Sequence, residues 1–125
     1  MKKGNYSRIR SFKDAFNGLF YILKTQANFR IQVFLGILAI AAGMLLNISM
    51  IEWCLIVLAI GLVLGAEAIN SSIEFLCDKM EINYNESIKR VKDSAAAAVL
   101  IVSISAFIMG CIIFLPKIMV QFIQP

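Results

Sequence analysis

The sequence predicts an all-α membrane protein in which an N-terminal amphipathic surface helix precedes three transmembrane helices. Two observations support this fold class. Of the 125 residues, 60% are hydrophobic and the mean hydropathy is +0.82, whereas a soluble domain is about 45–50% apolar. The excess lies in three long runs, each of which reaches the ~20 residues needed to span a bilayer. We expect a single domain over residues 1–125.

The three predicted spans cover about residues 29–50, 51–77 and 94–118. Pro116 predicts that the third span ends or bends near residue 115, because proline has no N–H to continue the helix. Residues 78–93, DKMEINYNESIKRVKD, are predicted to form the one substantial polar loop. Three helices are too few to enclose a roomy site, so we expect a homo-oligomer.

Residues 6–26 are predicted to form the surface helix. Apolar residues recur there at three- and four-residue steps, while most charged residues fall on other faces, which is typical of a helix lying on a membrane leaflet. The alternative is a helix packed on its own bundle. The apolar positions are Ile9, Phe12, Phe16, Leu19, Phe20 and Leu23.

Basic residues predict the orientation. Seven Lys or Arg residues lie before the first span or, like Arg30, at its start. Four lie in the 78–93 loop, and none lies in the connection around residues 47–52. This bias predicts a cytoplasmic N-terminus in an inner membrane. The net charge of +4 fits an anionic lipid or a nucleotide. No nucleic-acid partner is expected, because the clustered, aromatic-interleaved basic surface of such proteins is missing.

Acidic and amide residues interrupt the second span. At about 100° per residue, Glu67, Asn70, Glu74 and Asp78 fall on one narrow stripe of a helix, with Ser71 beside them. An ionisable residue at membrane depth indicates a functional site. Two other interpretations stay open at this point: a purely structural role in helix packing, and a water-lined pore or proton path.

Two other segments bring polar groups to the same depth. Lys92 and Asp93 precede the third span, and we expect Asp93 or Ser94 to be the N-cap of that helix, where an anion could bind. Polar residues also precede the first span, at Gln26, Asn28 and Gln32. The chain has no histidine, so any metal is expected to be a hard, oxygen-bound ion such as Mg²⁺. No GxxxxGKS/T or GxGxxG motif is present.

The segment GAEAINSSIEFLCD, followed by KRVKDSAAAAV, resembles the bacterial integral-membrane diacylglycerol kinase family, which includes undecaprenol kinases. The similarity extends from SFKDAFNGL to IIFLPK. The resemblance implies a lipid kinase with three spans and a surface helix, which uses ATP and Mg²⁺ and forms homotrimers with sites shared between subunits. A catalytically inert three-helix pore or scaffold is the alternative.

The resemblance also implies roles for individual residues. Glu67 is expected to be the general base for the lipid hydroxyl, and Asn70 to position the transferring phosphoryl group. Glu74 is expected to hold Mg²⁺. The nucleotide is expected to contact Arg10, Asp78, Lys92 and Asp93.

The chain departs from the family pattern at three positions. Gln26 stands where the family often has a glutamate that shares the metal with Glu74. A neutral amide keeps a carbonyl oxygen but loses the charge, so weaker metal binding is expected. Asn85 and Gln32 stand where many relatives carry histidine.

Overall fold

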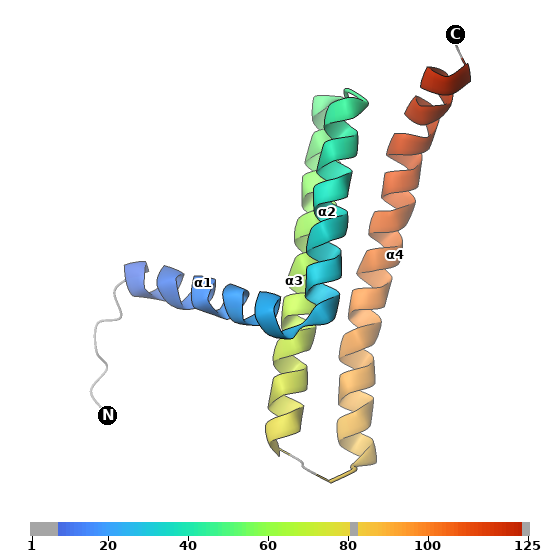
Figure 1. Ribbon diagram of the computed structural model, residues 1–125. Coiled ribbons are helices and arrows are strands. Elements are labelled where there is room, and N and C mark those ends of the chain that lie inside the picture. The colour runs from blue at the N-terminus through green and yellow to red at the C-terminus, as the bar shows by residue number, and fades with distance from the viewer. Residues whose placement is uncertain (1–7, 81–82, 124–125) are drawn as a thin grey trace.

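The computed structural model describes residues 8–80 and 83–123, which form four helices. These are α1 (Arg8–Thr25), α2 (Ala27–Leu45), α3 (Met50–Met80) and α4 (Glu86–Ile123). The all-α fold class is confirmed: α2, α3 and α4 run side by side and α1 projects sideways from them (Figure 1). Residues 6 and 7 of the predicted surface helix lie outside the described residues.

Helices α2, α3 and α4 are each long and apolar enough to cross a membrane, so the chain is a multi-pass membrane protein. α3 packs most extensively on α4, and α2 packs mainly on α3. α2 and α4 scarcely touch. Most large apolar side chains of the spans are exposed, as expected of surfaces that face lipid or other subunits.

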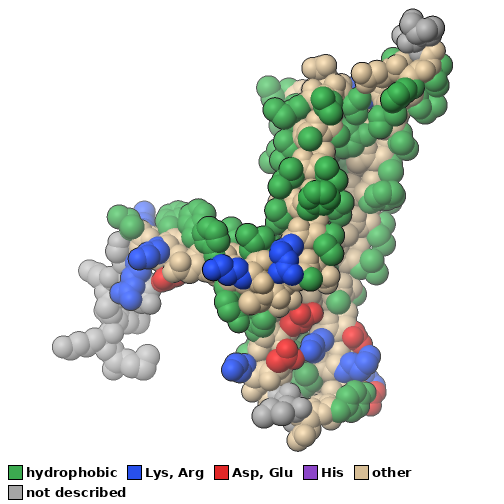
Figure 2. Space-filling view, in the orientation of Figure 1, with side chains coloured by type: hydrophobic (Ala, Val, Ile, Leu, Met, Phe, Trp, Pro, Cys, Tyr) green, Lys and Arg blue, Asp and Glu red, His purple; other side chains and the backbone are tan. Residues whose placement is uncertain are grey.

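Helix α1 has two different edges. In Figure 2, hydrophobic side chains line the upper edge of α1, and most of its basic side chains lie on the front and lower side. The corner between α1 and α2 is held by Arg30, whose Nη1 donates hydrogen bonds to the carbonyl oxygens of Leu23 (3.2 Å) and Lys24 (2.9 Å). A basic side chain thereby satisfies two of the open carbonyls at the C-terminus of α1.

A capping box begins α3. The Glu52 N–H donates to Ser49 Oγ (3.3 Å), and the Ser49 N–H donates to Glu52 Oε2 (2.7 Å). Such reciprocal bonds satisfy two open backbone donors at a helix start. Lys117 Nζ lies 3.1 Å from Glu52 Oε2, so the same carboxylate also ties the far part of α4 to the start of α3.

The prediction that Asp93 or Ser94 caps the third span is wrong. α4 begins at Glu86, and the side-chain oxygen of Asn85 accepts hydrogen bonds from the N–H groups of Ser87 (2.9 Å) and Ile88 (3.3 Å). Asparagine is among the best N-cap residues. Most of the expected 78–93 loop is therefore helical, because α3 continues to Met80 and α4 starts early.

Of the two alternatives expected at Pro116, an end or a bend of the helix near residue 115, the end is wrong. α4 continues through Pro116 to Ile123. Proline removes one backbone N–H, but ending the helix in an apolar setting would leave several backbone groups without partners. Continuation is therefore the less costly arrangement.

Candidate active site

The polar stripe of α3 runs from a buried end to an exposed end. Glu67, Asn70 and Ser71 are buried, with exposed fractions of 2%, 6% and 0%. Glu74 is half-buried and Asp78 is exposed. The stripe therefore offers a carboxylate that is shielded from water at one end and a carboxylate that is open to water at the other.

Two amides engage the carboxylates of the stripe. Gln32 Nε2, from α2, donates to Glu67 Oε2 at 3.4 Å, and Asn70 Nδ2 donates to Glu74 Oε1 at 3.2 Å. In the described part of the chain, three buried side-chain oxygens have no hydrogen-bond partner. They are Gln32 Oε1, Asn70 Oδ1 and Ser71 Oγ. Such atoms are costly to bury without a partner, so they mark places where a ligand could supply the missing hydrogen bond.

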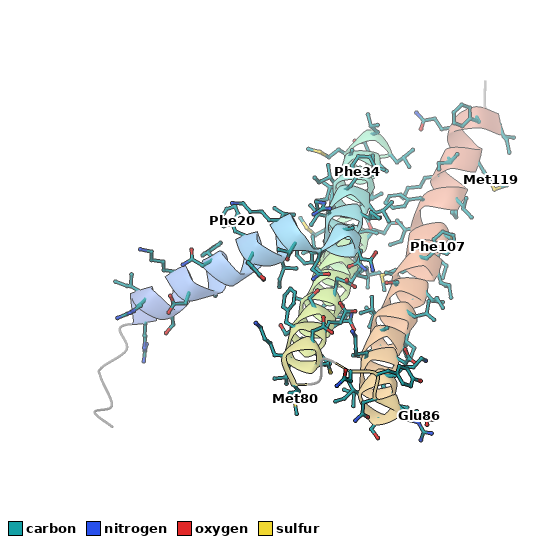
Figure 3. The ribbon with its side chains drawn as sticks, turned by 60° about the horizontal axis from the view of Figure 1, so that its bottom comes forward. Phe20, Phe34, Met80, Glu86, Phe107 and Met119 are labelled. Carbon is teal, nitrogen blue, oxygen red and sulfur yellow. The ribbon has the colours of Figure 1, made fainter. Side chains whose placement is uncertain are left out.

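The ends of α3 and α4 that extend toward the 81–85 connection carry a group of charges. Lys92 Nζ lies 2.9 Å from Asp78 Oδ1 and links the two helices. Asp93 instead pairs with Lys89 at 2.6 Å. Figure 3, with this end turned forward, shows nitrogen- and oxygen-bearing side chains between α3 and α4 near Met80 and Glu86. Lys92 and Asp78 are thus brought together, whereas Asp93 pairs along its own helix.

Gln26 and Arg10 lie at different places relative to the stripe. Gln26 is the N-cap residue of α2, and its side chain makes no capping hydrogen bond. The ring of Tyr21 meets that of Phe75 at a centroid distance of 5.4 Å, which brings the end of α1 beside the Glu74 level. Arg10 lies in the first turn of α1, at the end that is remote from the spans (Figure 1). One chain therefore does not bring Arg10 to the stripe.

An apolar cavity of about 410 Å³ lies between α2, α3 and α4. Apart from Gln32 and Ser103, its lining is apolar and includes Gly36, Ala59, Ile60 and Phe107. Since Gln32 also reaches Glu67, this amide stands at the boundary between the cavity and the stripe. The sequence placed Gln32 at the correct level, but its partner was missed. The available signal was a lone amide inside an apolar run.

The donor set suits a hard cation only in part. No group of three or more His, Cys, Asp or Glu side chains that could hold a metal occurs within residues 8–80 and 83–123. Glu74 is one carboxylate, and Asn70 Oδ1 is a buried oxygen without a partner. Mg²⁺ commonly uses one or two carboxylates together with substrate phosphates and water. The residues present fit a metal that arrives with a nucleotide.

Comparisons with known proteins agree on one family. The family model of prokaryotic diacylglycerol kinase matches residues 13–114. The chain belongs to the prokaryotic diacylglycerol kinase family. It is 33% identical over 109 residues to the undecaprenol kinase of Bacillus subtilis, a match covering 87% of this chain and 89% of that protein.

Two further members of this family are named for another acceptor. The diacylglycerol kinase of Synechocystis is 37% identical over 110 residues, which cover 87% of this chain and 63% of that protein. The diacylglycerol kinase of Escherichia coli is 35% identical over 88 residues, covering 70% and 72%. Family membership makes the chain a membrane lipid kinase, and its relatives' names differ in the lipid.

Proposed function

We propose that this chain transfers the γ-phosphate of ATP to the hydroxyl group of a membrane lipid, diacylglycerol or undecaprenol. The observation that carries the proposal is the stripe of α3, with Glu67 buried, Glu74 half-buried and Asn70 between them. Phosphoryl transfer depends mostly on positioning and on neutralising charge. Because the stripe passes from a shielded to a solvated environment, the lipid hydroxyl can approach its buried end and the nucleotide its exposed end.

In the proposed reaction the Glu67 carboxylate accepts the hydroxyl proton of the lipid. The lipid oxygen forms a bond to the γ-phosphorus, the bond from that phosphorus to the β–γ bridging oxygen breaks, and ADP leaves. The Asn70 amide, which reaches Glu74 at 3.2 Å, positions the transferring group. General-base assistance of this kind contributes typically about 10²- to 10⁴-fold.

Glu74, with Gln26, is the proposed holder of Mg²⁺. Bound Mg²⁺ would neutralise phosphate charge. The amide of Gln26 contributes no charge, so Glu74 carries most of the affinity. Asp78, Lys92, Asp93 and Arg10 are the proposed nucleotide contacts. Lys92 supplies a positive charge for a phosphate, which is the role an ammonium group performs as a point charge.

We also propose a homotrimer with shared sites in a bacterial inner membrane, with the N-terminus in the cytoplasm. Arg10 lies at the far end of α1 from its own stripe, so a neighbouring copy is the direct way to use it. The exposed apolar faces of the spans supply surfaces for such assembly. The two-sided character of α1 (Figure 2) fits a helix on the cytoplasmic leaflet.

The deciding experiment compares Glu67→Gln with Glu52→Gln. Each purified protein is given γ-labelled ATP and vesicles containing either diacylglycerol or undecaprenol, and the extracted lipids are examined for label. Glu67→Gln is expected to lose about 10²- to 10⁴-fold in rate while its elution on size exclusion is unchanged. Glu52 lies in the first turn of α3, far from the stripe, so Glu52→Gln should keep normal transfer.

Full transfer by assembled Glu67→Gln would remove Glu67 from the role of base. Absence of transfer to any lipid by the wild-type protein would instead favour an inert scaffold. The two acceptors, tested separately, identify which lipid is phosphorylated.

A further inference from the structure

We infer that Gln32 is a positioning residue for Glu67, which holds one carboxylate oxygen so that the other is aimed at the lipid hydroxyl. This inference rests on the proposed function, because it assigns to Gln32 a task within the same reaction. Its basis is the contact between Gln32 Nε2 and Glu67 Oε2 at 3.4 Å. In the described part of the chain, this is the one side-chain hydrogen bond that joins α2 to α3.

The surroundings of Gln32 argue against a packing role. The rest of the cavity that it borders is almost entirely apolar, so leucine or methionine would fill the same space. The amide instead leaves its Oε1 buried with no partner, which is unfavourable. A side chain that is costly in this environment is explained by the one useful contact that it makes, which is the donation to Glu67.

The chemistry of the pair fixes which end of the amide faces Glu67. An ionised carboxylate only accepts hydrogen bonds, so the NH₂ group must point toward it. Glu67 is 2% exposed, and none of the other described side chains donates a hydrogen bond to it. Without Gln32, the carboxylate would lose its only such anchor and could rotate away from the hydroxyl.

The position of Gln32 on a different helix gives this contact its value. Neighbours on α3 move together with Glu67, whereas Gln32 sets Glu67 relative to α2 and to the cavity between the spans. A base must lie within about 2.6–3.2 Å of the proton that it removes, and small misplacements from that geometry slow a reaction strongly.

The test combines Gln32→Leu with Glu67→Gln in a double-mutant cycle. Gln32→Leu suits the apolar lining and should assemble normally, with kcat lowered about 10- to 100-fold and the KM for ATP within about twofold of wild type. In a Glu67→Gln background, Gln32→Leu should cause no further loss, because its effect acts through Glu67. Gln121→Leu, the same substitution at the other end of the membrane, is the matched control.

A second variant separates shape from hydrogen bonding. Gln32→Met keeps about the length of the side chain but cannot donate a hydrogen bond to Glu67, so it should be about as slow as Gln32→Leu. Near-normal kcat in Gln32→Leu or in Gln32→Met would overturn the inference, as would losses that multiply in the double variant. A fully active Glu67→Gln would instead overturn the proposed function, so the two failures are distinguishable.

Discussion

Gly36→Ala is expected to slow the enzyme without unfolding it. A Cβ at Gly36 would lie 3.3 Å from Ile60 Cγ2, 3.7 Å from Cγ1 and 3.8 Å from Cδ1. The shortest of these requires α2 to move from α3, or Ile60 to yield, by a few tenths of an ångström. Gln32 lies one turn earlier on α2, so a moving helix would carry its amide away from Glu67.

The balance of energies predicts a folded variant. A tight contact of this kind costs about 1 kcal/mol, at the low end of overpacking, and alanine is favoured over glycine inside a helix by about 0.8–1.0 kcal/mol. These two effects nearly cancel. The hydrogen bond between Gln32 and Glu67 has no comparable compensation. At 3.4 Å it is already close to the longest distance at which a hydrogen bond forms, so a small movement of α2 would break it.

The assay measures kcat for lipid phosphorylation and the thermal unfolding midpoint of each variant. Because a 1 Å misplacement can cost about 10²-fold, a shift of a few tenths should lower kcat about 3- to 10-fold, with the midpoint close to wild type. Gly61→Ala is the control, since nothing lies within 4 Å of a Cβ built there. Wild-type kcat in Gly36→Ala, alongside a slow Gln32→Leu, would refute the link between helix packing and the site.

Three further predictions concern the metal, the nucleotide and the orientation. At fixed ATP, Gln26→Glu should lower the Mg²⁺ concentration for half-maximal activity, since hard cations favour charged oxygens; an unmoved midpoint would place Gln26 away from the metal. The double variant Asp78→Lys, Lys92→Asp should keep an ion pair between α3 and α4 but raise the KM for ATP about tenfold or more. A wild-type KM in this variant would mean that Lys92 only links the two helices. In a cysteine-free background, Asn83→Cys should react with an impermeant thiol reagent only after the cytoplasmic side is opened, and labelling in intact cells would reverse the proposed orientation.

Periodicity and hydropathy were enough to predict the elements of the fold. The apolar runs of α2, α3 and α4 and the two-faced pattern of α1 are each contained in a local stretch of sequence, so both could be found without tertiary information. The boundaries were less predictable. Asn85 and Asp93 are both good N-cap residues, and only the hydrogen bonds of Asn85 to Ser87 and Ile88 distinguish them.

The stripe of α3 was predictable because one helix carries all of it. The partners from other helices were not. Asn28 and Gln32 are one turn apart on nearly the same face of α2, so the height of α2 relative to α3 decides which of them contacts Glu67. The pairing of Asp93 with Lys89 was likewise hidden until α4 was known to begin at Glu86, since this i, i+4 contact exists only in a continuous helix.

The exposure gradient along α3 also bears on where the two substrates of the proposed reaction meet. The contact between Tyr21 and Phe75 sets the level of the surface helix, and on the proposed membrane placement it marks the headgroup region. Glu67 then lies about 12 Å toward the bilayer centre and Asp78 about 4.5 Å toward the cytosol, at 1.5 Å per residue. A lipid hydroxyl approaches from the first side and a nucleotide from the second. The place at which both can arrive is the level of Asn70 and Glu74, where an amide and a carboxylate already contact each other at 3.2 Å.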